Sequence, residues 1–165
     1  MAPIRMNVHA ITIDQHSNTP ILILKEEDGE RTLPIWIGLL EATAIATELE
    51  KISFARPMTH DLAINLLKAM GITIPKIVVN DLHDNTYYAL ITLEQGDKTI
   101  EVDARPSDAV ALALRAGAQI YVEEDVLLKS QPQKGTPATE INSDEEKKWA
   151  EILEELDPEA FKYKM

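Results

Sequence analysis

The sequence contains no cysteine, which excludes a disulfide framework, a thiolate metal site and a cysteine nucleophile. The absence of cysteine also fits a reducing compartment. No stretch approaches the roughly 18 consecutive apolar residues of a membrane-spanning helix. The N-terminal segment, MAPIRMNVHAITID, has no long apolar run after a basic stretch and so is not typical of a signal peptide. Together these absences predict a cytoplasmic protein without a membrane partner.

Basic residues are scarce: the 165 residues include 16 Lys and Arg against 28 Asp and Glu, and the formal net charge is −12 at pH 7. The excess of acid is spread along the chain, with −9 in residues 1–128 and −3 in residues 129–165. Proteins that bind nucleic acid gain most of their affinity by neutralising phosphates with Lys and Arg. The charge therefore argues against tight non-specific binding. A nucleic-acid ligand would need a local basic patch or a metal ion.

The length fits one domain with a short appendage. We expect a globular body over residues 1–128, followed by a flexible linker over residues 129–142, which are polar and rich in Pro, Gly and Thr. Residues 143–165 begin with a capping box and predict an amphipathic helix. Its apolar stripe consists of Trp149, Ile152, Leu153 and Leu156. Because an isolated helix of this length is marginal in water, it should dock on its own body or on a neighbouring subunit.

The body combines strand and helix patterns. Alternation and short apolar runs predict strands at residues 4–14, 21–25, 31–37, 76–80, 86–93, 98–103 and 119–123. Helical spacing predicts three helices, near residues 42–49, 63–70 and 108–116. The stripe of the second is Ala63, Leu66, Leu67 and Met70, facing a core or a partner. Pro34 indicates an edge strand, and the third helix, apolar almost all round, should be the most buried. This order favours an α+β fold: a mixed, largely antiparallel sheet packed with about three helices, plus the C-terminal helix.

Two segments, residues 56–62 (RPMTHDL) and 105–110 (RPSDAV), repeat one pattern: Arg-Pro, a hydroxyl residue, an acid and an apolar helix. Thr59 and Ser107 are good N-caps, because a hydroxyl oxygen accepts hydrogen bonds from the free N–H groups of a first turn. The acids would lie in that turn, where the helix dipole favours an anion. Capping accounts for these residues but not for the two arginines, nor for His60.

The two arginines have two interpretations, and the sequence leaves both open. Arg56 and Arg105 beside two helix N-termini would form an anion site, because free N–H groups and guanidinium both favour phosphate or carboxylate. Alternatively, each arginine forms an intramolecular salt bridge, for which Asp103, Asp61 and Glu41 are the candidate partners.

A cluster of acids is the candidate metal site. Asp61, Asp103 and Asp108 would converge if the two helices begin on the same side of the sheet, and carboxylates with a nearby His60 can hold Mg²⁺ or Mn²⁺. Two such ions can drive phosphodiester hydrolysis by activating water and stabilising the leaving oxygen. The sequence has no metalloprotease, EF-hand, P-loop or nucleophile-elbow motif that would indicate another chemistry.

Taken together, three ordered segments resemble the bifunctional nuclease domain family. They are residues 33–38 (LPIWIG) followed by an acid and alanine at 41–42, residues 56–62, and residues 103–109 (DARPSDA). The resemblance extends over roughly residues 6–128. It implies a compact α/β domain that self-associates, as a dimer or trimer, and nuclease activity on both RNA and DNA.

The first hypothesis is a nuclease that is assisted by a divalent metal. Asp61, Asp103 and Asp108 would hold Mg²⁺ or Mn²⁺, and His60 or Glu41 would position or deprotonate the attacking water.

In the same hypothesis the substrate is held by the arginines of the repeated pattern. Arg56 and Arg105 would bind the scissile phosphate, and the hydroxyl residues Thr59 and Ser107 are substrate-binding candidates beside them. The alternative is a non-enzymatic, homo-oligomeric binding or regulatory module, in which the same motifs cap helices and build an interface or an anion-binding pocket. The charge of −12 and the missing catalytic motif favour this second hypothesis.

Overall fold

A computed structural model of the chain describes residues 2–131, and the predicted linker and C-terminal helix lie outside these residues, apart from the first linker positions. The described elements follow one another as strands and helices in nearly the expected order. They are β1 (Ile4–Ile13), β2 (Pro20–Glu26), β3 (Thr32–Trp36), α1 (Leu39–Leu49), α2 (Thr59–Ala69), β4 (Thr73–His83), β5 (Thr86–Gln95), β6 (Lys98–Ala104), α3 (Pro106–Ala116), β7 (Gln119–Val122) and α4 (Glu124–Ser130). α4, a short helix that extends past residue 128, is not among the predicted elements. The domain boundaries stay predictions.

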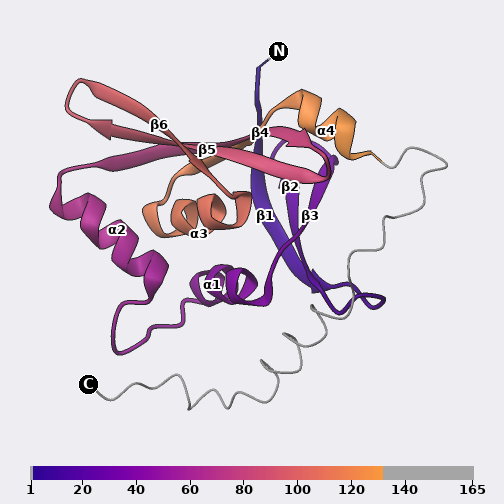
Figure 1. The fold of residues 1–165 in the computed structure, drawn as a ribbon, viewed down its shortest axis with the longest axis horizontal. Helices are drawn as coiled ribbons and strands as arrows, with labels where there is room; N and C mark the ends of the chain where they lie inside the picture. The colour runs from indigo at the N-terminus through magenta and orange to yellow at the C-terminus, as the bar shows by residue number, and fades with distance from the viewer. Residues whose placement is uncertain (1, 132–165) are drawn as a thin grey trace.

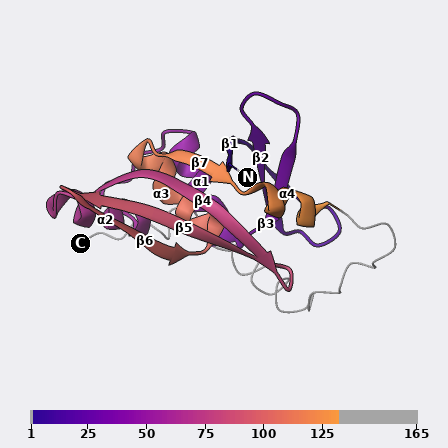
Figure 2. The same cartoon turned by 90° about the horizontal axis from the view of Figure 1, so that it is seen from above.

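All seven strands form one sheet in the order β3-β2-β1-β7-β4-β5-β6. Every neighbouring pair is antiparallel except β4 and β7, which are parallel. α1, α2 and α3 lie together on one side of the strands, and α4 lies at the far end, beside β3 and β4 (Figures 1 and 2). The expected α+β fold with a mixed, largely antiparallel sheet is confirmed.

One local expectation for the first strands is also confirmed. β3, which contains Pro34, is an edge strand of the sheet, so the missing N–H of proline costs no ladder bond. The pairing of β1 with β2 shifts register between Val8 and Ala10, a bulge that changes which residues of β1 face the core.

α3 is the central helix of the domain. It contacts α1, α2 and strands β4, β5 and β7, and six of its residues are buried. Its sequence, which is apolar almost all round, predicted that it would be the most buried helix, and neighbours do surround it. None of the helices among residues 2–131 is long and apolar enough to cross a membrane.

α2 differs from its expected orientation. Ile64 and the half-buried Leu67 face inward, whereas Leu66 and Met70 are 59% and 65% exposed. The expected stripe is therefore wrong in part: α2 is apolar on two sides, and the spacing alone does not tell which side faces the core. One apolar side of α2 is left in solvent.

Candidate functional site: a charged network at the starts of three helices

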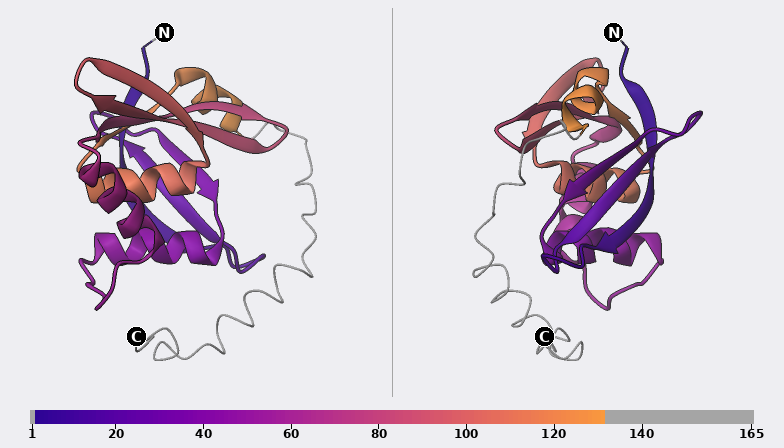
Figure 3. Two further views of the ribbon diagram at one scale, coloured as in Figure 1. Left: turned by 60° about the vertical axis from the view of Figure 1, so that its left-hand side comes forward. Right: turned by 90° about the vertical axis from the view of Figure 1, so that its right-hand side faces the viewer.

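The two Arg-Pro segments lead into α2 and α3, which contact each other (Figure 3). In α3, Pro106 is the first helical residue, a position that suits proline because it has no N–H to satisfy. The N-cap is therefore Arg105, and Ser107 is the second residue of the helix. Ser107 is only 6% exposed, so its hydroxyl is not presented to solvent. The expectation that Ser107 is an N-cap is wrong.

The start of α2 is capped by an acid rather than by a hydroxyl. Thr59 is the first helical residue and Met58 is the N-cap. The N–H of Met58 donates to Asp61 Oδ2 at 3.0 Å. The expected N-cap role of Thr59 is wrong for this reason: Asp61 reaches back and takes the free N–H itself. Thr59 is exposed.

Four side chains from three helix starts form one chain of contacts. Arg105 Nη1 donates to Glu41 Oε1 at 2.9 Å, and Arg105 Nε donates to Asp108 Oδ2, also at 2.9 Å. The other oxygen of Asp108, Oδ1, lies 2.9 Å from His60 Nε2. Glu41 comes from the first turn of α1, His60 from α2 and Asp108 from α3. The structure thus brings together four of the predicted site residues, and the salt-bridge interpretation holds for the pair of Arg105 with Glu41.

The network is half open to solvent. The side chains of His60 and Glu41 are 19% and 20% exposed, whereas that of Arg105 is 64% exposed. No described residue hydrogen-bonds to His60 Nδ1 or to Arg105 Nη2, so both atoms are available to a ligand.

Gly38 explains how Glu41 reaches this position. A Cβ at residue 38 would occupy the place of the Glu41 carboxylate. The absence of a side chain therefore lets the carboxylate fold back over the start of α1, where it accepts the bond from Arg105. The glycine and the acid, which belong to one sequence motif, act together.

Electrostatics favour the ionised form of this network. Burial alone would raise the pKa of Asp108, but the hydrogen bonds from Arg105 and His60 outweigh it and lower the pKa below the usual 3.8. The bonds to Asp108 and then to Glu41 raise the pKa of Arg105 further above its usual range. The carboxylate of Asp108 and the guanidinium of Arg105 are therefore charged at neutral pH.

A second ion pair lies beside the network, and sequence reasoning missed one of its members. Arg115, near the end of α3, donates from Nε to Asp61 Oδ1 at 2.7 Å and from Nη2 to the carbonyl of Ala44 at 3.0 Å. Its side chain is 8% exposed. Arg115 therefore joins α3 to both α2 and α1. The signal for it was present, because Arg115 is the one charged residue late in an otherwise apolar helix.

The three acids expected to share a metal ion are not gathered. Asp61 is bound by Arg115, and Asp108 by Arg105 and His60. Among residues 2–131, no three His, Asp or Glu side chains are placed to hold one ion. The donor set Asp61, Asp103 and Asp108 does not fit a Mg²⁺ or Mn²⁺ site as arranged here, and metal dependence stays a prediction.

Asp103 is separated from the other acids by the sheet. It pairs with Leu90 in the ladder between β5 and β6. Ala89 and Ile91, on either side of Leu90, belong to the buried core, so Leu90 and Asp103 point to the opposite face. Asp103 is exposed there.

Cations without a carboxylate partner are few in the part of the chain that the structure describes. Arg5, Lys25, Arg31, Lys51, Arg105, Arg115 and Lys129 form ion pairs. Arg56, Lys68, Lys76 and Lys98 have no such pair among residues 2–131. Arg56 is exposed two residues before the N-cap of α2, so it is the free cation nearest in sequence to His60.

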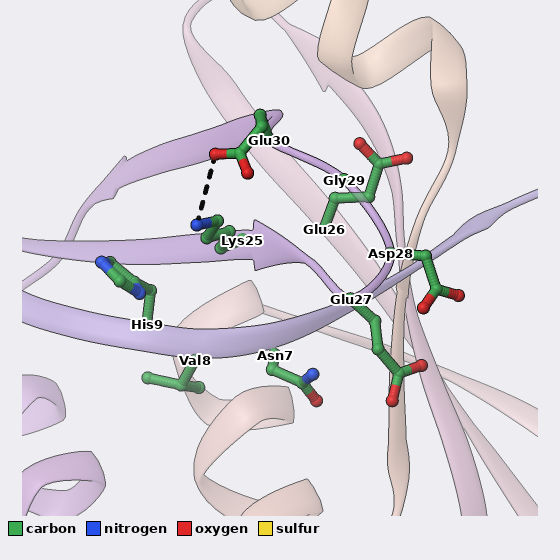
Figure 4. Close-up of a pocket in the computed structure, with 9 residues that line it drawn as sticks. All are labelled: Asn7, Val8, His9, Lys25, Glu26, Glu27, Asp28, Gly29 and Glu30. Atoms are coloured by element: carbon green, nitrogen blue, oxygen red, sulfur yellow. Dashed lines mark ion pairs between the residues drawn. The ribbon is translucent and has the colours of Figure 1, made fainter.

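A separate hollow among the described residues lies elsewhere. It has a volume of about 500 Å³ and lies at the turn between β2 and β3, at the other end of β3 from Glu41 (Figure 4). Its lining includes four acids, together with His9 and Lys25. Such a lining repels phosphate, so this hollow does not extend the charged network.

The lowered pKa values predict a pH dependence of stability. The pKa of Asp61, like that of Asp108, lies below 3.8, because the bonds from Arg115 and the Met58 N–H outweigh the effect of burial. A depressed pKa in the folded state adds stability above the unfolded pKa, and this stability is lost as the pH falls through the folded pKa. We expect the free energy of unfolding to fall below about pH 5.

Urea unfolding between pH 7 and pH 2 measures this effect. Asp61→Asn and Asp108→Asn should each make the profile flatter below pH 5, because each removes one titrating carboxylate. Asp103→Asn is the control, since Asp103 is exposed and has no ion pair among residues 2–131. If all three variants follow the parent profile, these two carboxylates do not contribute as described.

Comparison with known proteins shows what the chain is similar to. The family model for the bifunctional nuclease domain matches residues 22–134. An uncharacterized protein of Mycobacterium tuberculosis is 41% identical over 162 residues, which are 95% of this chain and 97% of that protein. A protein named bifunctional nuclease 2 from Oryza sativa subsp. japonica is 27% identical over 73% of this chain, and one of the same name from Arabidopsis thaliana is 28% identical over 62%. These alignments span only 38% and 32% of the two plant proteins. The chain belongs to the bifunctional nuclease domain family.

Proposed function

We propose that this protein hydrolyses phosphodiester bonds in RNA, DNA or both, at the network of Glu41, His60, Arg105 and Asp108. The observation that carries the proposal is the contact of 2.9 Å between His60 Nε2 and Asp108 Oδ1, next to the exposed guanidinium of Arg105. A carboxylate that holds an imidazole in place is a common arrangement for a general base. The names of the plant relatives point to the same activity.

Each side chain has a role in the proposed reaction. Water attacks the phosphorus atom, and His60 accepts a proton from the water at Nδ1, the ring nitrogen that has no hydrogen-bond partner among residues 2–131. The bond between phosphorus and the leaving sugar oxygen breaks, and that oxygen takes up a proton from solvent. Arg105 and Arg56 stabilise the negative charge on the phosphate oxygens. Glu41 fixes the guanidinium of Arg105, and Asp108 fixes the imidazole.

Hydrolysis of labelled single-stranded RNA and DNA by the purified chain tests the proposal. We expect turnover of at least one substrate and a loss of about 100-fold for Arg105→Met, which removes a positioned donor. Arg5→Met is the matched control, because Arg5, on β1, is also exposed and also forms an ion pair with a glutamate, Glu27. A chelator added in parallel tests the predicted need for Mg²⁺ or Mn²⁺. No turnover at high protein concentration would overturn the proposal.

A second function is favoured by one observation: the carboxylates of Glu41, Asp61 and Asp108 are all bound by arginines of the same chain. In this alternative the motifs hold three helices together, and the protein is a non-enzymatic binding or regulatory module. Self-association as a dimer or trimer belongs to this proposal as well. Arg105→Met should then change stability or oligomeric state, measured by unfolding and by sedimentation, while neither parent nor variant hydrolyses nucleic acid.

A further inference from the structure

The described domain leaves an apolar stripe on α2 uncovered. Leu62, Leu66 and Met70 are 50%, 59% and 65% exposed and follow one another at a spacing of four residues. Met58, at the N-cap, continues the stripe and is 43% exposed. Residues four apart lie above one another on a helix, so these side chains form a single strip along α2. A strip of this kind on the surface indicates a contact surface rather than a scatter of single apolar residues.

We propose that the C-terminal segment of the same chain, residues 143–158, docks on this stripe. Its sequence predicts an amphipathic helix whose apolar residues, Trp149 to Leu156, need a partner in water. The two stripes match in length. At the rise of a helix, the seven residue intervals from Trp149 to Leu156 span about 10 Å, and the eight residue intervals from Leu62 to Met70 span about 12 Å. The proposal does not depend on the proposed function.

The charges at the ends of the stripe fit this occupant. Residues 143–158 contain seven acids and two lysines, and the acids lie on both sides of the apolar residues. On the domain, Arg56 precedes the stripe, and Lys98 lies at its other end. Lys98 pairs with Gln95, whose Nε2 donates to the carbonyl of Met70 at 2.7 Å. Neither Arg56 nor Lys98 has an ion pair among residues 2–131.

The linker is long enough to reach the stripe. α4 is held to β4 by the ion pair of Lys129 with Asp81, and β6 is two strands away from β4, roughly 10 Å. The path along β6 from Ala104 back to Lys98 adds roughly 20 Å. Residues 132–142 span up to about 40 Å when extended. The distance along the sheet is therefore within reach.

A segment of the same chain is favoured over a second copy by the tether. A linker that spans the distance raises the local concentration of the segment, so a weaker contact between two helices suffices than for a separate copy. Two separate copies would need about 1,000 Å² of well-packed interface to associate stably. The alignment with the mycobacterial protein covers 95% of this chain and so extends into this segment, whereas the family model ends at residue 134.

Tryptophan fluorescence of the full chain tests the docking. The chain has two tryptophans, so Trp36→Phe leaves Trp149 as the sole reporter. In this background we expect blue-shifted emission that does not depend on protein concentration, and a shift to the emission of water-exposed tryptophan in Leu66→Asp. Leu40→Asp is the matched control, because Leu40 is also a helical leucine with 59% exposure. Water-like emission in the Trp36→Phe parent, or an equal response to both substitutions, would overturn the proposal.

Cross-linking decides which chain supplies the tail. The natural chain has no cysteine, so Leu66→Cys combined with Leu153→Cys introduces a single pair. Oxidation should close a disulfide within one chain, which keeps the monomer mass on a non-reducing gel. Formation of linked dimers alone would show that a second copy occupies the stripe, and failure of both products to form would show that the tail does not dock there.

Discussion

Arg115→Ala should lower the free energy of unfolding by about 3 kcal/mol, the largest effect on stability that we expect from a single charged residue. The side chain of Arg115 is 8% exposed, and its guanidinium donates to Asp61, to the carbonyl of Ala44 and to that of Ala111. Its removal leaves a partly buried carboxylate without its cation and takes one donor away from each of two carbonyls. Three helices lose the side chain that joins them. Urea unfolding at pH 7 measures the effect as a lower midpoint with an unchanged slope.

Two variants separate the geometry of Arg115 from its charge. Arg115→Lys keeps the charge but has no planar fork to reach Asp61 and Ala44 together, so the loss should be intermediate. Arg5→Ala removes an exposed pair with Glu27 and should cost no more than about 1 kcal/mol. A double-mutant cycle with Asp61→Asn should give a coupling of about 1 kcal/mol or more. If Arg115→Ala and Arg5→Ala are equally mild, Arg115 does not hold the helices as described.

The parts of the fold that the sequence predicted correctly are those fixed by local chemistry. Pro34 cannot donate to a ladder, and its strand is at an edge. α3 is apolar almost all round and is the most buried helix. In each case the residue type restricts the backbone or the environment whatever lies around it.

The errors arise where two local signals compete. Ser107 is a good N-cap by type, but Pro106 before it takes the first helical position and moves the cap to Arg105. Leu66 and Leu67 both suit an apolar stripe, and only the packing of α2 against α3 shows that Leu67 faces inward. The choice between such signals is made by tertiary contacts, which a single sequence does not contain.

The candidate site was predictable in its members but not in its pairings. The sequence offered Glu41 as one of three possible partners of Arg105, 64 positions away along the chain, and the fold selects it. It also grouped Asp103 with Asp61 and Asp108, but alternation along β6 turns Asp103 to the other face of the sheet. The Arg-Pro motifs in the sequence therefore located the site. The geometry of β6 decided that Asp103 does not belong to it.

His60→Ala should lower kcat for phosphodiester hydrolysis by about 1,000-fold, the largest effect on activity that we expect. The imidazole is the group that accepts a proton in the proposed reaction, and its contact with Asp108 Oδ1 at 2.9 Å fixes its orientation. Loss of that contact should cost only about 1 kcal/mol of stability, so the variant stays folded. His9→Ala is the control, because His9 is exposed on β1 and lines the distant acidic hollow.

Free imidazole separates a role in proton transfer from a role in structure. In His60→Ala, added imidazole can enter the space left by the side chain and accept the proton in its place, so activity should rise with imidazole concentration. A histidine that only links α2 to Asp108 would not be replaced in this way, because a free ring does not restore the connection between the helices. Unchanged activity of His60→Ala, or a loss equal to that of His9→Ala, would remove His60 from the reaction and leave the network with its structural role alone.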